Sequence, residues 1–318
     1  MQTDTDKEKI SEPEMRQYGL CRLCPRNCGI NRLKGEKGFC RMGYRPVVAR
    51  AALHFWEEPC ISGQEGSGTV FFSGCNLRCV FCQNREISRG EAGKEISTDR
   101  LAEIFMELQQ KGANNINLVT GVMFIPSIVT AIRAAKEKGL RIPVIYNCGG
   151  YESAEALRLL EGLVDVYLPD FKYMEEDAAN MYSNAPDYAK WAKTAIAEMV
   201  RQTGKPVFDR RGMIQRGVIV RHLLLPGRRK EAERIIAYLY QTYGDDIYFS
   251  IMNQYTPMQI SGKKPEAGPF RELFRKVTSY EYEKTIDFAL SLGITKGYMQ
   301  EGGTAEESFI PPFDLEGV

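Results

Sequence analysis

The chain has 318 residues, and its 42 basic side chains nearly balance 41 acidic ones. This balance gives no electrostatic reason to expect a nucleic-acid or membrane partner. Residues 1–19 are polar and lack the apolar core of a signal peptide, and no stretch approaches about 18 consecutive apolar residues. We therefore expect a cytoplasmic protein that begins with a flexible tail over residues 1–19.

The next segment, residues 20–62, is rich in Cys, Gly, Pro and Arg. It contains Cys21, Cys24, Cys28 and Cys40, here called the N-terminal quartet, with the spacing C-x2-C-x3-C-x11-C. Nine cysteines without a secretion signal favour metal binding over disulfides. Four thiolates suit a zinc ion and equally a 4Fe–4S cluster, and the sequence leaves both open. We expect a small metal-binding module here, because the segment has too few apolar residues for its own core.

From residue 68 onward, short apolar runs alternate with amphipathic segments, which is typical of repeated βα units. Six runs predict strands over residues 69–73, 116–120, 143–147, 164–169, 218–225 and 247–252. Helices are predicted over residues 98–112, 126–139, 153–161, 187–202, 230–242 and 279–292. These units favour an α/β domain over residues 63–318, a partial (β/α)6 barrel. A doubly wound open sheet is the alternative, because sequence does not give strand order.

A second group of cysteines directly follows the first of these strands. Cys75, Cys79 and Cys82, here called the cluster triplet, have the spacing C-x3-C-x2-C. Three thiolates can bind three irons of a 4Fe–4S cluster and leave the fourth iron open to an external chelate. The amine and carboxylate of S-adenosylmethionine (SAM) suit that position, where one electron cleaves SAM into methionine and a 5′-deoxyadenosyl radical. The alternative is three buried or zinc-binding cysteines, although zinc would then lack a fourth ligand.

These motifs resemble the radical SAM superfamily, whose signature C-x3-C-x-aromatic-C has Phe81 at its aromatic position. More closely, the chain is similar to the branch related to pyruvate formate-lyase activating enzyme. That similarity runs through SGCNLRCVFCQN, YNCGGYE, YLPDFKY, VIVRHLLLPG and the ending GGTAEESFIPPFDLEGV. It implies a partial (β/α)6 radical SAM barrel and an anaerobic oxidoreductase that abstracts hydrogen from a substrate. The implied partners are an electron donor such as flavodoxin or ferredoxin, and a glycyl radical enzyme, peptide or small molecule as substrate.

The resemblance also implies which side chains bind SAM. Asp170 and Lys172 match a pair that contacts SAM or an ion beside it, and a buried charge at a strand end is costly unless paired. The alternative is a structural Asp–Lys pair and a buried histidine. Cys60 and Cys148 are expected to be unligated. The implied SAM-binding set is Phe81, Thr120, Asn147, Asp170, Lys172 and His222.

Residues 120–124 read Thr-Gly-Val-Met-Phe where the relatives carry Thr-Pro-Thr-His-Phe. One hypothesis is that this segment reaches the mouth of the barrel and favours a more apolar substrate. The other is that it packs against the N-terminal module. A separate hypothesis concerns function, in which the chain is a non-enzymatic iron–sulfur or zinc protein that senses redox state or acts as a scaffold.

Overall fold

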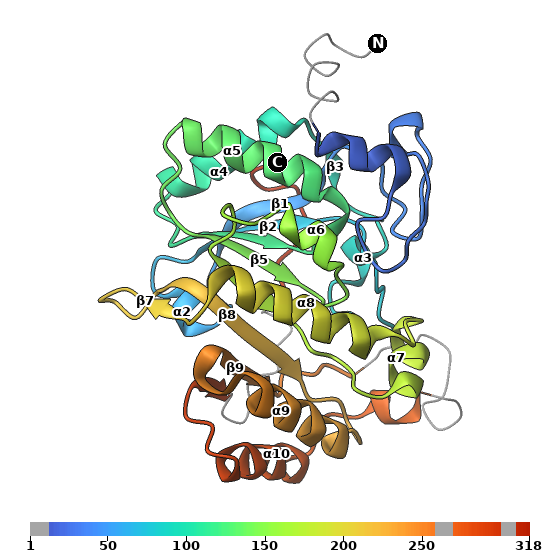
Figure 1. The fold of residues 1–318 in the computed structure, drawn as a ribbon, viewed down its shortest axis with the longest axis vertical. Coiled ribbons are helices and arrows are strands. Elements are labelled where there is room, and N and C mark those ends of the chain that lie inside the picture. Colours follow the sequence, from blue (N-terminus) through green and yellow to red (C-terminus); the bar gives the residue numbers. More distant parts are fainter. Residues whose placement is uncertain (1–12, 258–269, 300–309) are drawn as a thin grey trace.

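The structure is a computed structural model that describes residues 13–257, 270–299 and 310–318. Its strands are β1 (Val47–His54), β2 (Ser67–Phe72), β3 (Lys94–Glu95), β4 (Ile116–Val119), β5 (Val144–Cys148), β6 (Val166–Pro169), β7 (Val207–Phe208), β8 (Ile214–Leu223), β9 (Tyr248–Met252) and β10 (Gly297–Met299). The parallel strands lie in the order β2-β4-β5-β6-β8-β9-β10, and β1 and β3 extend the β2 edge as antiparallel neighbours (Figure 1).

Helices connect each parallel strand to the next. The α-helices are α2 (Pro59–Ser62), α3 (Arg85–Ser88), α4 (Thr98–Gln110), α5 (Ile125–Glu137), α6 (Ala154–Arg158), α7 (Glu176–Ser183), α8 (Tyr188–Thr203), α9 (Arg229–Tyr243) and α10 (Ser279–Ser291). Short 3-10 helices are η1 (Met15–Leu20), η2 (Arg32–Lys34), η3 (Val122–Phe124), η4 (Gly244–Asp246) and η5 (Arg271–Phe274). None of the helices in the described part of the chain is long and apolar enough to cross a membrane.

The strand order distinguishes the two predicted folds. Strands that follow one another along the chain are also neighbours in the parallel part of the sheet, and the order never reverses. A doubly wound sheet requires such a reversal. The prediction of a partial (β/α)6 barrel is therefore confirmed, with β10 as a further parallel strand beside β9.

Local sequence explains the helix boundaries well. α4 begins after Ser97, whose side chain accepts a hydrogen bond from the Arg100 amide, and it buries the apolar face seen in the sequence. α5 has a proline in its first turn, as predicted. α10 starts with a capping box between Thr278 and Glu281. Each of these signals depends only on residues near the start of the helix, and for this reason the sequence could predict these three helices.

The structure adds β1, which the sequence pattern did not indicate. This strand lies inside the cysteine-rich segment 20–62, yet it pairs with β2 of the barrel over most of its length. Its residues Val48, Ala49, Ala51 and Ala52 are all buried, so both of its faces are covered. A strand covered on both faces lacks the alternation that reveals a strand in sequence.

Part of the predicted tail is folded. η1 buries Met15 and Tyr18, and the Tyr18 hydroxyl lies 3.0 Å from the hydroxyl of Ser127 on α5. The expectation of a loose tail is therefore wrong for residues 15–19, whereas residues 1–12 lie outside the described residues. The ending motif of the sequence also lies partly outside them, because residues 300–309 are not described.

The last residues of the chain return to the sheet beside β1. The Leu315 amide donates to the Ala49 carbonyl, and the Ala51 amide donates to the Glu316 carbonyl, at 3.0 and 2.8 Å. The Phe313 ring lies edge-on against Phe71, with centroids 5.7 Å apart. The C-terminal segment therefore forms part of the wall of the barrel interior.

Candidate functional site

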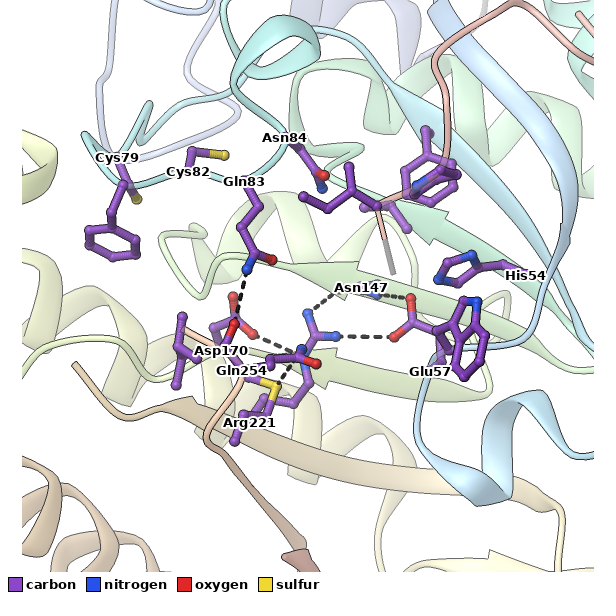
Figure 2. A pocket seen from close by; sticks show the side chains of 18 of the residues that line it. His54, Glu57, Cys79, Cys82, Gln83, Asn84, Asn147, Asp170, Arg221 and Gln254 are labelled. Carbon is purple, nitrogen blue, oxygen red and sulfur yellow. Dashed lines mark hydrogen bonds and ion pairs between the residues drawn. The ribbon is translucent and has the colours of Figure 1, made fainter. Parts of the chain in front are cut away.

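A cavity of about 220 Å³ lies at the carboxyl ends of the parallel strands. Its wall includes the last residues of β4, β8 and β9, namely Val119, Leu223 and Met252. The loop that carries the cluster triplet covers one end, and the loop after β1 covers another (Figure 2). This is the location at which (β/α) folds collect reactive groups.

The triplet loop is held in a tight conformation. Gly74 has φ +86°, and a Cβ there would collide with Met42 of the N-terminal module. The Cys75 sulfur accepts amide hydrogen bonds from Leu77 and Arg78 at 3.3 and 3.5 Å. The Cys79 sulfur accepts the Ser183 hydroxyl at 3.0 Å. Such N–H and O–H donors stabilise negative charge on cluster-ligating sulfur.

The triplet fits an iron–sulfur cluster by its chemistry as well. Burial, together with the neighbouring Cys79 and Cys82, raises the pKa of Cys75 to about 12. Three thiolates this close together need a metal centre to hold them deprotonated. Cys79 and Cys82 both line the cavity, so a cluster bound here would face it. Among the residues that the structure describes, no three Cys, His, Asp or Glu side chains enclose a single ion.

Opposite the triplet, Arg221 of β8 organises a buried network of charges (Figure 2). Its guanidinium donates to Asp170 Oδ1 at 2.9 Å, to Glu57 Oε2 at 3.2 Å and to Asn147 Oδ1 at 2.6 Å. Lys172 also donates to Asp170. The network therefore connects the ends of β5, β6 and β8 to the loop after β1.

Electrostatics keep most of this network ionised. Burial opposes the charge of Asp170, but Arg221 and Lys172 hold the pKa of its carboxyl below the usual value. The pKa of Arg221 and of Lys172 stays above the usual value despite burial, because acidic side chains surround them. Glu57 differs, since burial raises its pKa more than Arg221 lowers it. Arg221 and Lys172 therefore present two cations to the cavity beside the carboxylate of Asp170.

The structure brings four of the sequence-predicted SAM residues together around this cavity. Phe81, Asn147, Asp170 and Lys172 all line it. Phe81 also contacts Tyr173, Tyr182 and Tyr255, with ring centroids 6.1–6.5 Å apart. Their roles toward SAM remain predictions, but their positions are compatible with one bound molecule.

Two other predicted residues lie elsewhere. His222 does not line the cavity, because its neighbour Arg221 occupies the inward position of β8 and successive strand residues face opposite sides. The His222 Nδ1 lies 2.7 Å from the Phe171 carbonyl oxygen. Burial lowers its pKa to about 4, so the ring is neutral and Nδ1 donates. Thr120 also lies outside the cavity wall, with a left-handed φ of +59° and its amide bonded to the Asn147 carbonyl.

Sequence reasoning missed Arg221 and Glu57. Arg221 stood next to the proposed histidine in the same motif, and strand alternation means that only one of the two can point inward. Glu57 follows the strand that the pattern did not reveal. Its Oε1 accepts the amides of Asn117 and Asn147 at 3.2 and 3.3 Å.

The segment 120–124 packs instead of forming the cavity mouth. Val122 and Met123 are buried, and neither lines the cavity. The Met123 carbonyl accepts a hydrogen bond from Arg32 of the N-terminal module at 2.9 Å. The hypothesis that this segment meets the substrate is wrong, and the packing hypothesis is supported.

The other minor expectations can be placed as well. Cys60 and Cys148 are buried away from the cavity. His54 lies edge-on to Phe71, with centroids 5.8 Å apart, and burial lowers its pKa to about 4. His54 and Trp56 both line the cavity.

The N-terminal quartet surrounds a small cavity of its own. All four thiols line it, together with Arg32 and Asn76. Cys21 and Cys40 are buried, whereas Cys24 and Cys28 are partly exposed. The quartet therefore has an inner edge against the barrel and an outer edge near the surface.

A family model and several known proteins are similar to this chain. Residues 69–239 match the family model described as the radical SAM superfamily. An uncharacterized protein of Methanocaldococcus jannaschii, MJ0674, is 28% identical over 277 residues, which cover 85% of this chain and 74% of that protein. The pyruvate formate-lyase-activating enzyme of Clostridium pasteurianum is 27% identical over 116 residues, 34% of this chain and 46% of the enzyme. The crystal structure of HydG, a maturase of the [FeFe]-hydrogenase, has a TM-score of 0.47 and 15% identity over 69% of this chain and 48% of HydG.

Proposed function

Because the chain belongs to the radical SAM superfamily, we propose that it reductively cleaves SAM to methionine and a 5′-deoxyadenosyl radical. The radical then abstracts hydrogen from a protein, peptide or small-molecule substrate. The observation that carries this proposal is that Cys79 and Cys82 face a polar cavity containing paired buried charges. A non-enzymatic sensor or scaffold would have no need for such a cavity beside its cluster.

The triplet would hold a 4Fe–4S cluster, which supplies the electron for cleavage when it is bound. The chain itself would bind and orient SAM. Lys172 and Arg221 are the cations that would bind the SAM carboxylate, since both line the cavity and Lys172 interacts electrostatically with Cys79 and Cys82. Asp170 holds both cations in place through its two oxygens. A pre-organised pair of this kind costs no rearrangement when the ligand binds.

The other lining residues of the cavity would accommodate the nucleoside of SAM and the substrate. Gln83 of the triplet loop donates to the Gln254 carbonyl at 2.9 Å, which ties that loop to the segment after β9. Trp56 of the loop after β1 and Pro311 of the C-terminal segment also line the cavity. We assign the end near Gln83 and Phe81 to the nucleoside of SAM. The end near Trp56 is then left for the substrate.

The test is anaerobic reconstitution with iron and sulfide, followed by addition of dithionite and SAM. Formation of 5′-deoxyadenosine and methionine supports the proposal. A reconstituted chain that holds its cluster but releases neither product refutes it and favours a redox sensor.

The local similarity to an activating enzyme makes a glycyl radical enzyme one candidate substrate. The other is a peptide or small molecule modified directly. A glycyl-radical EPR signal in a co-incubated partner enzyme supports the first. Substrate-dependent 5′-deoxyadenosine formation without such a signal supports the second. In either case the proposed reductant is a flavodoxin or a ferredoxin.

A further inference from the structure

The N-terminal quartet and the cluster triplet are joined through a single residue. Asn76 directly follows Cys75 of the triplet, and it also lines the quartet cavity. Because neighbouring Cα atoms are 3.8 Å apart, a group in that cavity lies on the order of 10 Å from the Cys75 sulfur. The quartet is therefore a direct neighbour of the triplet.

Arg26 fixes this contact from the quartet side. It lies between Cys24 and Cys28 in sequence, and its Nε donates to the Asn76 carbonyl at 2.8 Å. Its other nitrogens donate to the carbonyls of Ser183 and Asn184. Its guanidinium also stacks on Phe39, 3.9 Å from the ring centroid. One side chain thus anchors the quartet loop to the triplet loop and to the barrel.

A buried positive charge lies beside the quartet. Arg32 is only 2% exposed, and an arginine stays protonated in proteins. Its guanidinium donates to the Cys40 sulfur at 3.2 Å and to the carbonyls of Gly43 and Met123. A buried cation needs a negative counter-charge nearby. Metal-bound thiolates of the quartet would supply that charge.

The outer edge of the quartet is accessible. Cys24 lines a surface hollow of about 520 Å³, together with Arg22 and Trp191. Cys40, on the inner edge, is buried. The quartet therefore extends from a surface hollow to the residue that follows Cys75. This is the arrangement of a relay, and a zinc ion has no redox chemistry with which to use it.

We propose that the quartet holds a second iron–sulfur cluster, through which electrons from an external one-electron donor protein reach the cluster triplet. This inference rests on the proposed function for the fate of the electron. One electron enters at the Cys24 edge and reduces the quartet centre. The same electron then passes to the triplet centre, which reoxidises the quartet centre. No bond forms or breaks, and no proton moves in this transfer.

The first test uses the full chain with Cys75, Cys79 and Cys82 all changed to alanine. After anaerobic reconstitution we expect about four irons and four sulfides per chain, which is one cubane cluster. Dithionite should then produce the EPR signal of a reduced cluster. Bound zinc without sulfide, or no bound metal in a folded chain, overturns the proposal. This variant lacks the SAM-binding centre, so its outcome does not depend on SAM cleavage.

The second test concerns Arg32 and is carried out in the same triplet-free chain. Arg32→Gln removes the buried cation and should disfavour the reduced, more negative cluster by at least tenfold. For one electron, tenfold corresponds to about 59 mV toward a more negative midpoint potential. Arg32→Lys keeps the charge and should shift the potential less, while Arg22→Gln changes an exposed arginine of the same cysteine-rich segment. Equal potentials in all of these chains would overturn the charge argument.

The relay itself is tested by relaxation of the reduced quartet centre. In the unmodified chain, a reduced triplet cluster nearby should make the quartet EPR signal relax faster than it does in the triplet-free chain. Equal microwave power saturation in the two chains places the centres too far apart and overturns the relay. The comparison needs only the triplet variant, so loss of folding in quartet variants does not affect it.

Discussion

Replacing Arg221 by methionine tests the buried network at the centre of the proposed site. The Arg221 side chain is 15% exposed, and those of Asp170 and Glu57 are 14% and 10% exposed. Removing one partner of a buried ion pair costs about 3–5 kcal/mol, because it leaves the other charge without compensation. Lys172 continues to pair with Asp170. The loss therefore falls mainly on Glu57, which among the described residues retains the side-chain amides of Asn117 and Asn147.

The size of this effect depends on pH. Burial already raises the pKa of Glu57, and loss of Arg221 removes the cation that lowers it. The folded-state pKa in Arg221→Met therefore lies further above the unfolded value. A carboxyl of this kind destabilises the fold increasingly as pH rises from the unfolded to the folded pKa. We expect Arg221→Met to cost about 3 kcal/mol at pH 8, near the lower limit for a buried pair, and less at pH 5.

The measurement is urea unfolding of the anaerobically reconstituted chain at both pH values. Arg100→Met is the matched control, since Arg100 pairs with Glu107 on α4 with 31% of its side chain exposed. A surface pair of this kind contributes about 0–1 kcal/mol. The double variant Arg221→Met/Glu57→Gln should recover about 1–3 kcal/mol, because neither residue then carries a charge. A loss below 1 kcal/mol at pH 8, or no recovery in the double variant, would refute the reasoning.

Three further predictions follow from the same geometry. Cys79→Ala should abolish 5′-deoxyadenosine formation, whereas Cys60→Ala, in the barrel interior, should retain it; product assays by liquid chromatography distinguish the two. Lys172→Gln should weaken SAM binding about tenfold, or about 1.4 kcal/mol, in calorimetry while cluster absorbance stays unchanged, and unchanged affinity argues against a carboxylate contact. Burial raises the pKa of Glu152 to about 8, so stability should fall as pH rises from 5 to 8, by at most about 1.4 kcal/mol per pH unit. Glu152→Gln should remove that slope in urea titrations, and an equal slope in both chains would contradict the assignment.

Much of the fold follows from local sequence signals. The six predicted βα units all occur, because amphipathic helices such as α4 and α5 carry their own caps, prolines and apolar faces. The cluster triplet could also be predicted from sequence, because its three ligands lie within eight residues and one loop can bring them together. Asp170 and Lys172 were implied by the resemblance to the activating-enzyme branch, and the cost of an unpaired charge at the end of an apolar strand agrees with that expectation.

The remaining site residues depend on information that the sequence does not carry. β8 is buried on both faces, with Val220 among the helices and Ile219 in the barrel interior. Its pattern therefore does not tell whether Arg221 or His222 faces inward, and a shift of one residue exchanges them. Glu57 reaches the cavity only because β1 pairs antiparallel with β2 and returns its loop to the interior. That pairing connects segments without any local signal of their contact.

The structure changes the interpretation of residues 121–123, which differ from the residues that the relatives carry there. It suggested a changed substrate pocket, but Met123 presents its carbonyl to Arg32, and the same guanidinium donates to Cys40 of the quartet. The apolar side chain of Met123 suits this buried position, because an unpaired polar side chain there would carry a desolvation cost. The segment thus supports the quartet module beside the triplet loop. Differences in what the cavity accepts must then arise elsewhere on its wall, which includes Trp56 and Pro311 besides the strand ends and the triplet loop.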